Sequence, residues 1–248
     1  MFTSVLQYNK EMQINTSGGQ TNFKWNKTTH LEMTMLALQN SSIDDITKRQ
    51  VARYAQMPDF AKTELGYHNN THFFFPNSKK KSFGLDSDKL NAFSQFKEHL
   101  QQAMLSEDKE EVLKKLGYAL HYLQDMSVPL HTEPGGLIHK ILKYKLHGNF
   151  ERGKKYGATA HLDILTQNFK AENLEYSSIL DLFTKTAEYS QNPEFKVKRF
   201  NKKNWISIQQ ACFNRGVNAS REFLEKVLAV KNLSLIHISE PTRRTPIS

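Results

Sequence analysis

Hydrophobic residues recur at helical spacing along most of the chain, whereas the alternation typical of strands is nearly absent. The first amphipathic stripe consists of Leu90, Phe93, Leu100 and Met104. Asp86 or Ser87 precedes this stripe and is expected to cap the helix that it predicts.

A second stripe predicts a helix over residues 109–125, which would carry His121 and Asp125 on the side opposite its aliphatic residues. That stripe consists of Val112, Leu113, Leu116, Ala119, Leu120 and Leu123. Further helices are expected over residues 30–40, 43–56, 159–170, 175–190 and 204–230. The apolar run from Thr71 to Pro76 is closed by its proline and predicts a loop. The pattern therefore predicts one all-α, multi-helix domain.

Size and charge narrow the range of partners. The chain has 248 residues, enough for one large core, and no stretch approaches the roughly 18 apolar residues of a membrane span. Its net charge of +9 favours anionic partners such as phospholipid surfaces, nucleic acid or phosphorylated substrates. The lysine runs 79–81 and 202–203 are explained equally well as solvated loop charges. A single cysteine, Cys212, excludes an internal disulfide and a zinc site built on several thiolates.

The two ends of the chain differ from the rest. Residues 1–24 lack the apolar core of a signal peptide, and we treat them as an N-terminal extension that is removed or disordered. Residues 233–248, which include His237, break the helical pattern and resemble a translated sequencing-adapter read-through. Residues 25–232 are therefore expected to form the folded domain.

Five possible metal ligands fall within the 31 residues from His121 to Glu151. His121 and Asp125 are four residues apart, as are His147 and Glu151, so each pair would lie on one helix face and could hold one ion. Histidine and carboxylate ligands without cysteine are typical of catalytic zinc.

An exposed polar helix face would also explain His121 and Asp125 alone. The residues that follow make that explanation difficult. Pro129 ends the helix and His131 comes directly after the turn, before the same spacing recurs at His147 and Glu151. We therefore favour the metal site.

These residues resemble the signature of the zinc-dependent phospholipase C family, which contains bacterial phosphatidylcholine-hydrolysing enzymes and alpha-toxins. The signature stands here as His121-Tyr-Leu-Gln-Asp125, Pro129-Leu-His131 and His147-Gly-Asn-Phe-Glu151. Three weaker segments lie upstream in the family's order, at Thr29-His30-Leu31, Met57-Pro58-Asp59-Phe60 and Thr71-His72-Phe73.

The resemblance implies an all-α catalytic domain over residues 25–232 with up to three zinc ions. It assigns His72, His121 and Asp125 to one ion. It assigns His131, His147 and Glu151 to a second ion, and it gives His30 a share of the Asp125 carboxylate at a third. Asp59 would be a ligand or the general base.

In the family, the free amine of an N-terminal tryptophan completes the third zinc site. The candidate here is Trp25, five residues before His30 and preceded by 24 residues. This spacing fits the related fungal single-strand nucleases better than typical phospholipases C, whereas Glu151 fits the phospholipases. The alternative explanation of Trp25 is a half-buried aromatic residue of the core.

The resemblance implies a secreted, monomeric hydrolase of phosphatidylcholine-type phospholipids that works at a membrane surface and releases diacylglycerol. A single-strand nuclease is the alternative enzyme, and a non-catalytic relative that binds zinc or membranes is the alternative of another class. Three further histidines, His99, His139 and His161, have no partner at metal-binding spacing and are expected to be exposed.

Overall fold

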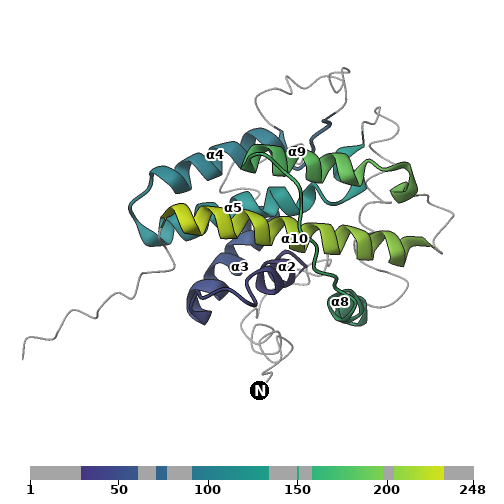
Figure 1. Cartoon of the computed structure of the whole chain (residues 1–248), viewed down its shortest axis with the longest axis horizontal. Coiled ribbons are helices and arrows are strands. Elements are labelled where there is room, and N and C mark those ends of the chain that lie inside the picture. The colour runs from purple at the N-terminus through teal and green to yellow at the C-terminus, as the bar shows by residue number, and fades with distance from the viewer. Residues whose placement is uncertain are drawn as a thin grey trace, which may run out of the picture.

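Helices account for nearly all of the regular structure in the computed structural model, which describes residues 29–60, 71–76, 91–133, 150, 158–197 and 204–231 (Figure 1). The helices are α2 (Thr29–Ala37), α3 (Asp45–Phe60), α4 (Ala92–Leu105), α5 (Lys109–Asp125), α6 (Pro129–Thr132), α8 (Ala158–Gln167), α9 (Ile179–Ser190) and α10 (Trp205–Lys231), with a 3-10 turn η1 (Pro193–Phe195). Within these ranges there is no strand, which confirms the predicted all-α class. The segment 71–76 is a loop, as expected.

Helix α5 runs through the middle of the bundle. It packs against α3, α4, α10 and α2, and Figure 1 shows α10 running along it, between α4 and α3. Every residue from Leu116 to Asp125 is buried, including those opposite the aliphatic stripe. The side of α5 that carries His121 and Asp125 is therefore an interior surface, and the alternative of an exposed polar face is excluded.

Local capping decides where two of the helices begin. At the start of α4, Asn91 Oδ1 accepts a hydrogen bond from Ser94 N at 2.8 Å, and Asn91 N donates to Ser94 Oγ at 3.0 Å. The cap predicted at Asp86 or Ser87 is therefore wrong, because the helix begins at Ala92 and Asn91 satisfies its free amides. At the start of α5, Asp108 Oδ1 accepts from Glu111 N at 2.7 Å.

Helix α3 extends past the end predicted at residue 56. It continues to Phe60 and includes Pro58 in its last turn. Pro58 has no N–H to donate to the carbonyl four residues earlier, and the helix continues for only two residues beyond it. As a result Asp59 is carried by a helix rather than by a loop.

The main core joins α4, α9 and α10 to α5. Phe96 is fully buried, and its ring centroid lies 4.7 Å from Phe183 and 5.6 Å from Phe223. A smaller cluster forms around Phe150 and Trp205, whose ring centroids are 5.7 Å apart, and it also contains the buried Cys212.

None of the described helices is long and apolar enough to cross a membrane.

The division into segments 1–24, 25–232 and 233–248 stays a prediction. Residues 1–28 and 232–248 lie outside the described residues, and so do several stretches between them.

Candidate metal centre

Six of the nine predicted ligands meet at one end of α5. They come from α2, α3, the 71–76 loop, α5 and α6, and they are His30, Asp59, His72, His121, Asp125 and His131. The other three, Trp25, His147 and Glu151, lie outside the described residues. Residues up to about 100 positions apart in the sequence are thus brought within a few ångströms of one another.

Asp125 lies at the centre of this group, and its two carboxylate oxygens face different pairs of histidines. Oδ2 is 2.8 Å from His72 Nδ1 and 3.4 Å from His121 Nε2. Oδ1 is 3.5 Å from His30 Nε2 and 3.7 Å from His131 Nε2. A carboxylate placed in this way can bridge ions that lie on the sides of its two oxygens.

Most of these separations fit zinc. Two ligand atoms that each lie about 2.1 Å from a tetrahedral zinc ion are about 3.4 Å from each other. The three longer contacts of Asp125, at 3.4, 3.5 and 3.7 Å, are close to that value. The side-chain chemistry agrees, because nitrogen and oxygen ligands without sulfur suit a zinc site that keeps a position for water.

His72 approaches more closely than the other histidines. Its Nδ1 lies 2.8 Å from Asp125 Oδ2 and 3.1 Å from His121 Nε2. Both of those atoms act as acceptors here, so His72 Nδ1 carries a proton between them. A zinc ion bound at this position would take the place of that proton.

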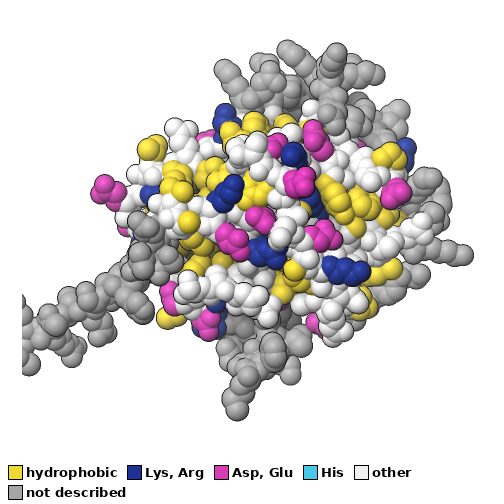
Figure 2. All heavy atoms as spheres, viewed as in Figure 1, with side chains coloured by type: hydrophobic (Ala, Val, Ile, Leu, Met, Phe, Trp, Pro, Cys, Tyr) yellow, Lys and Arg dark blue, Asp and Glu magenta, His cyan; other side chains and the backbone are white. Residues whose placement is uncertain are grey.

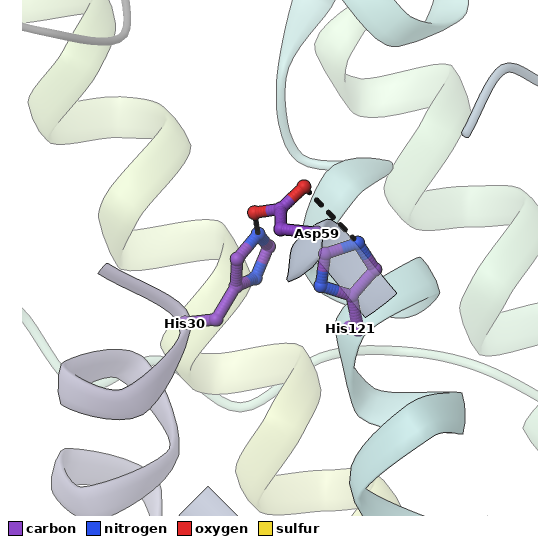
Figure 3. A group of neighbouring side chains, drawn as sticks. All are labelled: His30, Asp59 and His121. Carbon is purple, nitrogen blue, oxygen red and sulfur yellow. Dashed lines mark ion pairs between the residues drawn. The ribbon is translucent and has the colours of Figure 1, made fainter. Parts of the chain in front are cut away.

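Asp59 lies between two of the rings, as Figure 3 shows. Its Oδ2 is 3.8 Å from His30 Nε2 and its Oδ1 is 4.0 Å from His121 Nε2. His30, Asp59 and His121 thus form a second possible metal group beside that of His72, His121 and Asp125. The Asp59 side chain is 47% exposed, so this side of the centre faces solvent.

Backbone carbonyls fix the protonation of two rings. His121 Nδ1 donates to Ala55 O at 2.9 Å, and His131 Nδ1 donates to His72 O at 2.8 Å. A carbonyl can only accept, so each proton is on Nδ1 and each Nε2 lone pair faces Asp125. This is the tautomer that a metal ligand requires. The outer nitrogen of each ring, which is the one that faces away from Asp125, is held by a hydrogen bond.

The charges of the group suit a metal as well. Burial would raise the pKa of Asp125, but His131, His121 and the hydrogen bond from His72 hold it well below its ordinary value. Burial lowers the pKa of His121 to about 3, with a further contribution from His30. The surrounding protein would raise the pKa of Asp59, but the nearby histidines, His121 foremost, lower it overall. Ionised carboxylates and neutral imidazoles are the forms that bind zinc.

One expectation about the other histidines is wrong. His99 is only 3% exposed, with its ring 5.3 Å from that of Tyr118 and 6.0 Å from that of Tyr122. It is three residues from Phe96 and four from Ala103, on the buried face of α4. This helical spacing could have predicted that His99 is buried. His139 and the side chain of His161 lie outside the described residues.

Gln124 is a further side chain at this site that the sequence pattern did not predict. This glutamine is 1% exposed, and its Oε1 lies 2.8 Å from His30 Nδ1. Nothing in the spacing of the metal-ligand candidates pointed to it, because it lies between His121 and Asp125 on another face of α5.

No protein-family model matches the sequence, and no curated protein matches it either. Solved structures do match. The alpha toxin from Clostridium absonum has a TM-score of 0.54 at 15% identity, and the Clostridium perfringens alpha-toxin of avian strain SWCP has a TM-score of 0.55 at 16% identity. Each match covers 85% of this chain and 66% of the toxin, so the chain spans 66% of the length of these toxins.

At these identities the likeness concerns the fold. Residues 121–151 resemble the signature of the family to which the alpha-toxins belong. The sequence motifs and the fold therefore agree. The resemblance first seen in the motifs is confirmed at the level of the fold: this chain has the helical fold of the matched part of the alpha-toxins.

Proposed function

We propose that the chain is a zinc-dependent phosphodiesterase that hydrolyses phosphatidylcholine-type phospholipids to diacylglycerol and a phosphorylated head group. The observation that carries this proposal is the placement of Asp125, whose two oxygens each face a pair of histidines. The alpha-toxin fold supports the same function.

The ligands divide into three groups under this proposal. His72, His121 and Asp125 would hold one ion, and His30 would share the Asp125 carboxylate at another. His131 would contribute to the remaining ion together with His147 and Glu151, and Trp25 would complete the His30 site. Bound zinc supplies positive charge that neutralises the phosphate under attack and lowers the pKa of water.

Asp59 acts at the solvent side of the centre. Its carboxylate is ionised at neutral pH because the nearby histidines lower its pKa, and it is the most exposed acidic group of the cluster. From this position it accepts the proton of the attacking water or serves as a further ligand. The buried side of the centre, formed by His121 and Asp125, orients the ligands and excludes bulk water.

The partner is the head-group region of a phospholipid surface, reached by a secreted monomer. Figure 2 shows basic and acidic side chains interspersed over the visible described surface, with hydrophobic side chains between them. The net charge of +9 supports attraction to anionic lipid as a general effect of the whole chain.

Incubation of the zinc-loaded protein with short-chain phosphatidylcholine tests this function. Release of phosphocholine is expected, with His121→Ala inactive and His99→Phe active. Both substitutions remove a buried histidine, but only His121 belongs to the centre. A wild-type protein that holds zinc and leaves the lipid intact would contradict the proposed substrate.

A single-strand nuclease is the second candidate, favoured by the basic charge and by the five-residue spacing of Trp25 and His30. The same samples incubated with single-stranded DNA distinguish the two, since nucleotide release without lipid cleavage identifies the nuclease. Zinc binding without either product identifies a non-catalytic relative.

A further inference from the structure

Three of the histidines that face Asp125 present Nε2 to it, and each has a partner for its outer nitrogen. For His121 and His131 that partner is a backbone carbonyl, which can only accept. For His30 the partner is the side-chain amide of Gln124, whose Oε1 lies 2.8 Å from His30 Nδ1. An amide can turn round and offer its NH2 group instead, so this contact alone does not fix the proton on His30.

The other end of the Gln124 amide settles its orientation. Nε2 lies 3.0 Å from Thr34 Oγ1 on α2 and 3.0 Å from Ser220 Oγ on α10. Thr34 Oγ1 donates its one proton to His30 O at 2.8 Å, and Ser220 Oγ donates its one proton to Gly216 O at 2.8 Å. Both hydroxyls can therefore only accept from Gln124, which requires the NH2 group at their end.

All three polar side chains are buried, so water does not replace these bonds. Gln124 is 1% exposed, and Thr34 and Ser220 are fully buried. If the amide turned round, its oxygen would face two hydroxyl oxygens whose protons are already used, and its NH2 group would face His30. Buried polar groups without partners are costly, so one orientation prevails.

We propose that Gln124, held by Thr34 and Ser220, is a positioning residue that keeps His30 in the Nδ1–H tautomer with its Nε2 lone pair directed at Asp59 and Asp125. Those two carboxylates lie 3.8 and 3.5 Å from His30 Nε2. His30 is thus prepared as a ligand before any ion arrives. The role for zinc rests on the proposed function, whereas the tautomer is a property of the metal-free protein.

The test is a long-range ¹H–¹⁵N correlation spectrum of histidine-labelled, metal-free protein at about pH 8, above the ordinary pKa of imidazole. The His30 signals are assigned by their loss in His30→Asn. The wild type should show His30 as the Nδ1–H tautomer alone. Observation of the Nε2–H tautomer, or of a mixture, in the wild type would overturn the proposal.

Variants separate positioning from simple packing. Gln124→Met keeps the side-chain volume and removes the acceptor, and Thr34→Val/Ser220→Ala keeps Gln124 but frees its amide to turn. Both should lose the single Nδ1–H tautomer of His30. Thr34→Val alone should keep it, because Ser220 still accepts from the amide. A double variant that folds and retains the wild-type His30 spectrum would show that the hydroxyls do not orient Gln124.

Gln209→Met is the matched control. Gln209 is a buried glutamine of α10, 5% exposed, whose amide donates to Phe150 O away from His30. This variant should leave the His30 spectrum unchanged even if it lowers stability.

Zinc titration gives the second readout. Gln124→Met should weaken the His30 site by about 10- to 100-fold, the range for loss of an outer partner of a metal ligand, and Gln209→Met should not. Equal zinc affinity in the two variants would refute the positioning role. A wild type with the predicted tautomer that binds no zinc would refute the proposed function and leave the tautomer assignment standing.

Discussion

Gly117 of α5 lies directly against the backbone of α3 at Tyr54. A β-carbon added to Gly117 would be 2.8 Å from the carbonyl carbon of Tyr54 and 2.9 Å from the amide nitrogen of Ala55. Backbone atoms cannot turn aside as a flexible side chain can. The two helices therefore pack at this distance only because residue 117 has no side chain.

Gly117→Ala should therefore move α3 away from α5 and destabilise the protein by about 1–3 kcal/mol, the usual cost of overpacking. The zinc affinity should fall too, because α3 supplies Asp59 and the carbonyl of Ala55 that accepts a hydrogen bond from His121. Urea unfolding of the metal-free protein and zinc titration measure the two effects.

Gly216→Ala on α10 is the control for this substitution. Its β-carbon would meet the side chain of Met33, with Sδ at 2.9 Å, and Ser127 Oγ at 3.0 Å. Met33 can adjust its rotamer, and alanine favours the helix over glycine by about 1 kcal/mol. A Gly117→Ala protein as stable as Gly216→Ala would show that α3 and α5 are not held at contact distance.

Hydrophobic periodicity was sufficient to predict the helical class and the approximate extent of most helices, because an amphipathic stripe reflects burial directly. It failed where local polar bonds decide the outcome. Asn91 caps α4 through a reciprocal pair of bonds with Ser94, and this pair is invisible to a count of apolar positions. The end predicted for α3, at residue 56, was too early, because the helix continues through Pro58 to Phe60.

Spacing and resemblance together predicted that His121 and Asp125 belong to the metal centre, and the structure brings His30, Asp59, His72 and His131 to the same place. Spacing and resemblance could not predict which groups form hydrogen bonds with the outer nitrogens of the histidines. Ala55 O and Gln124 contact the rings only after distant helices have packed, so no short motif contains them.

Asp125→Asn should abolish most zinc binding. The amide has nearly the shape of the carboxylate but only one oxygen and no negative charge, so it cannot serve both pairs of histidines. Both halves of the centre should lose affinity together, as measured by competition with a chromophoric chelator. An exposed carboxylate on α3, Asp45, with its side chain 77% exposed, provides the control Asp45→Asn. Unchanged zinc content and affinity in Asp125→Asn would contradict the bridging role.

Asp59→Asn should reduce turnover by at least about a hundredfold, the scale expected for loss of a general base. Its side chain is 47% exposed, so the free energy of unfolding should change little. The assay is phosphocholine release at saturating lipid, with urea unfolding in parallel and Asp45→Asn as the matched variant. Full activity in Asp59→Asn would remove Asp59 from the chemistry.

His99 should make the stability of the metal-free protein depend on pH. Burial lowers the pKa of His99 from 6.5 to about 4, and the charge of Lys115 adds to this effect. Between these two values the unfolded chain binds a proton that the folded protein does not, so the free energy of unfolding falls as the pH falls from about 6.5 to 4. The contribution of this one group should reach roughly 3 kcal/mol at the acid end.

His99→Phe keeps an aromatic ring against Tyr118 and Tyr122 but cannot bind the proton. Urea unfolding of both proteins at several pH values isolates the contribution of His99, because the other buried titratable groups, His121 included, are common to the two. The stability of His99→Phe relative to the wild type should rise steadily below about pH 6.5, whatever its value at neutral pH. Parallel curves for the two proteins would mean that His99 takes up its proton in the folded state as readily as in the unfolded chain, and that its burial against α5 does not control its charge.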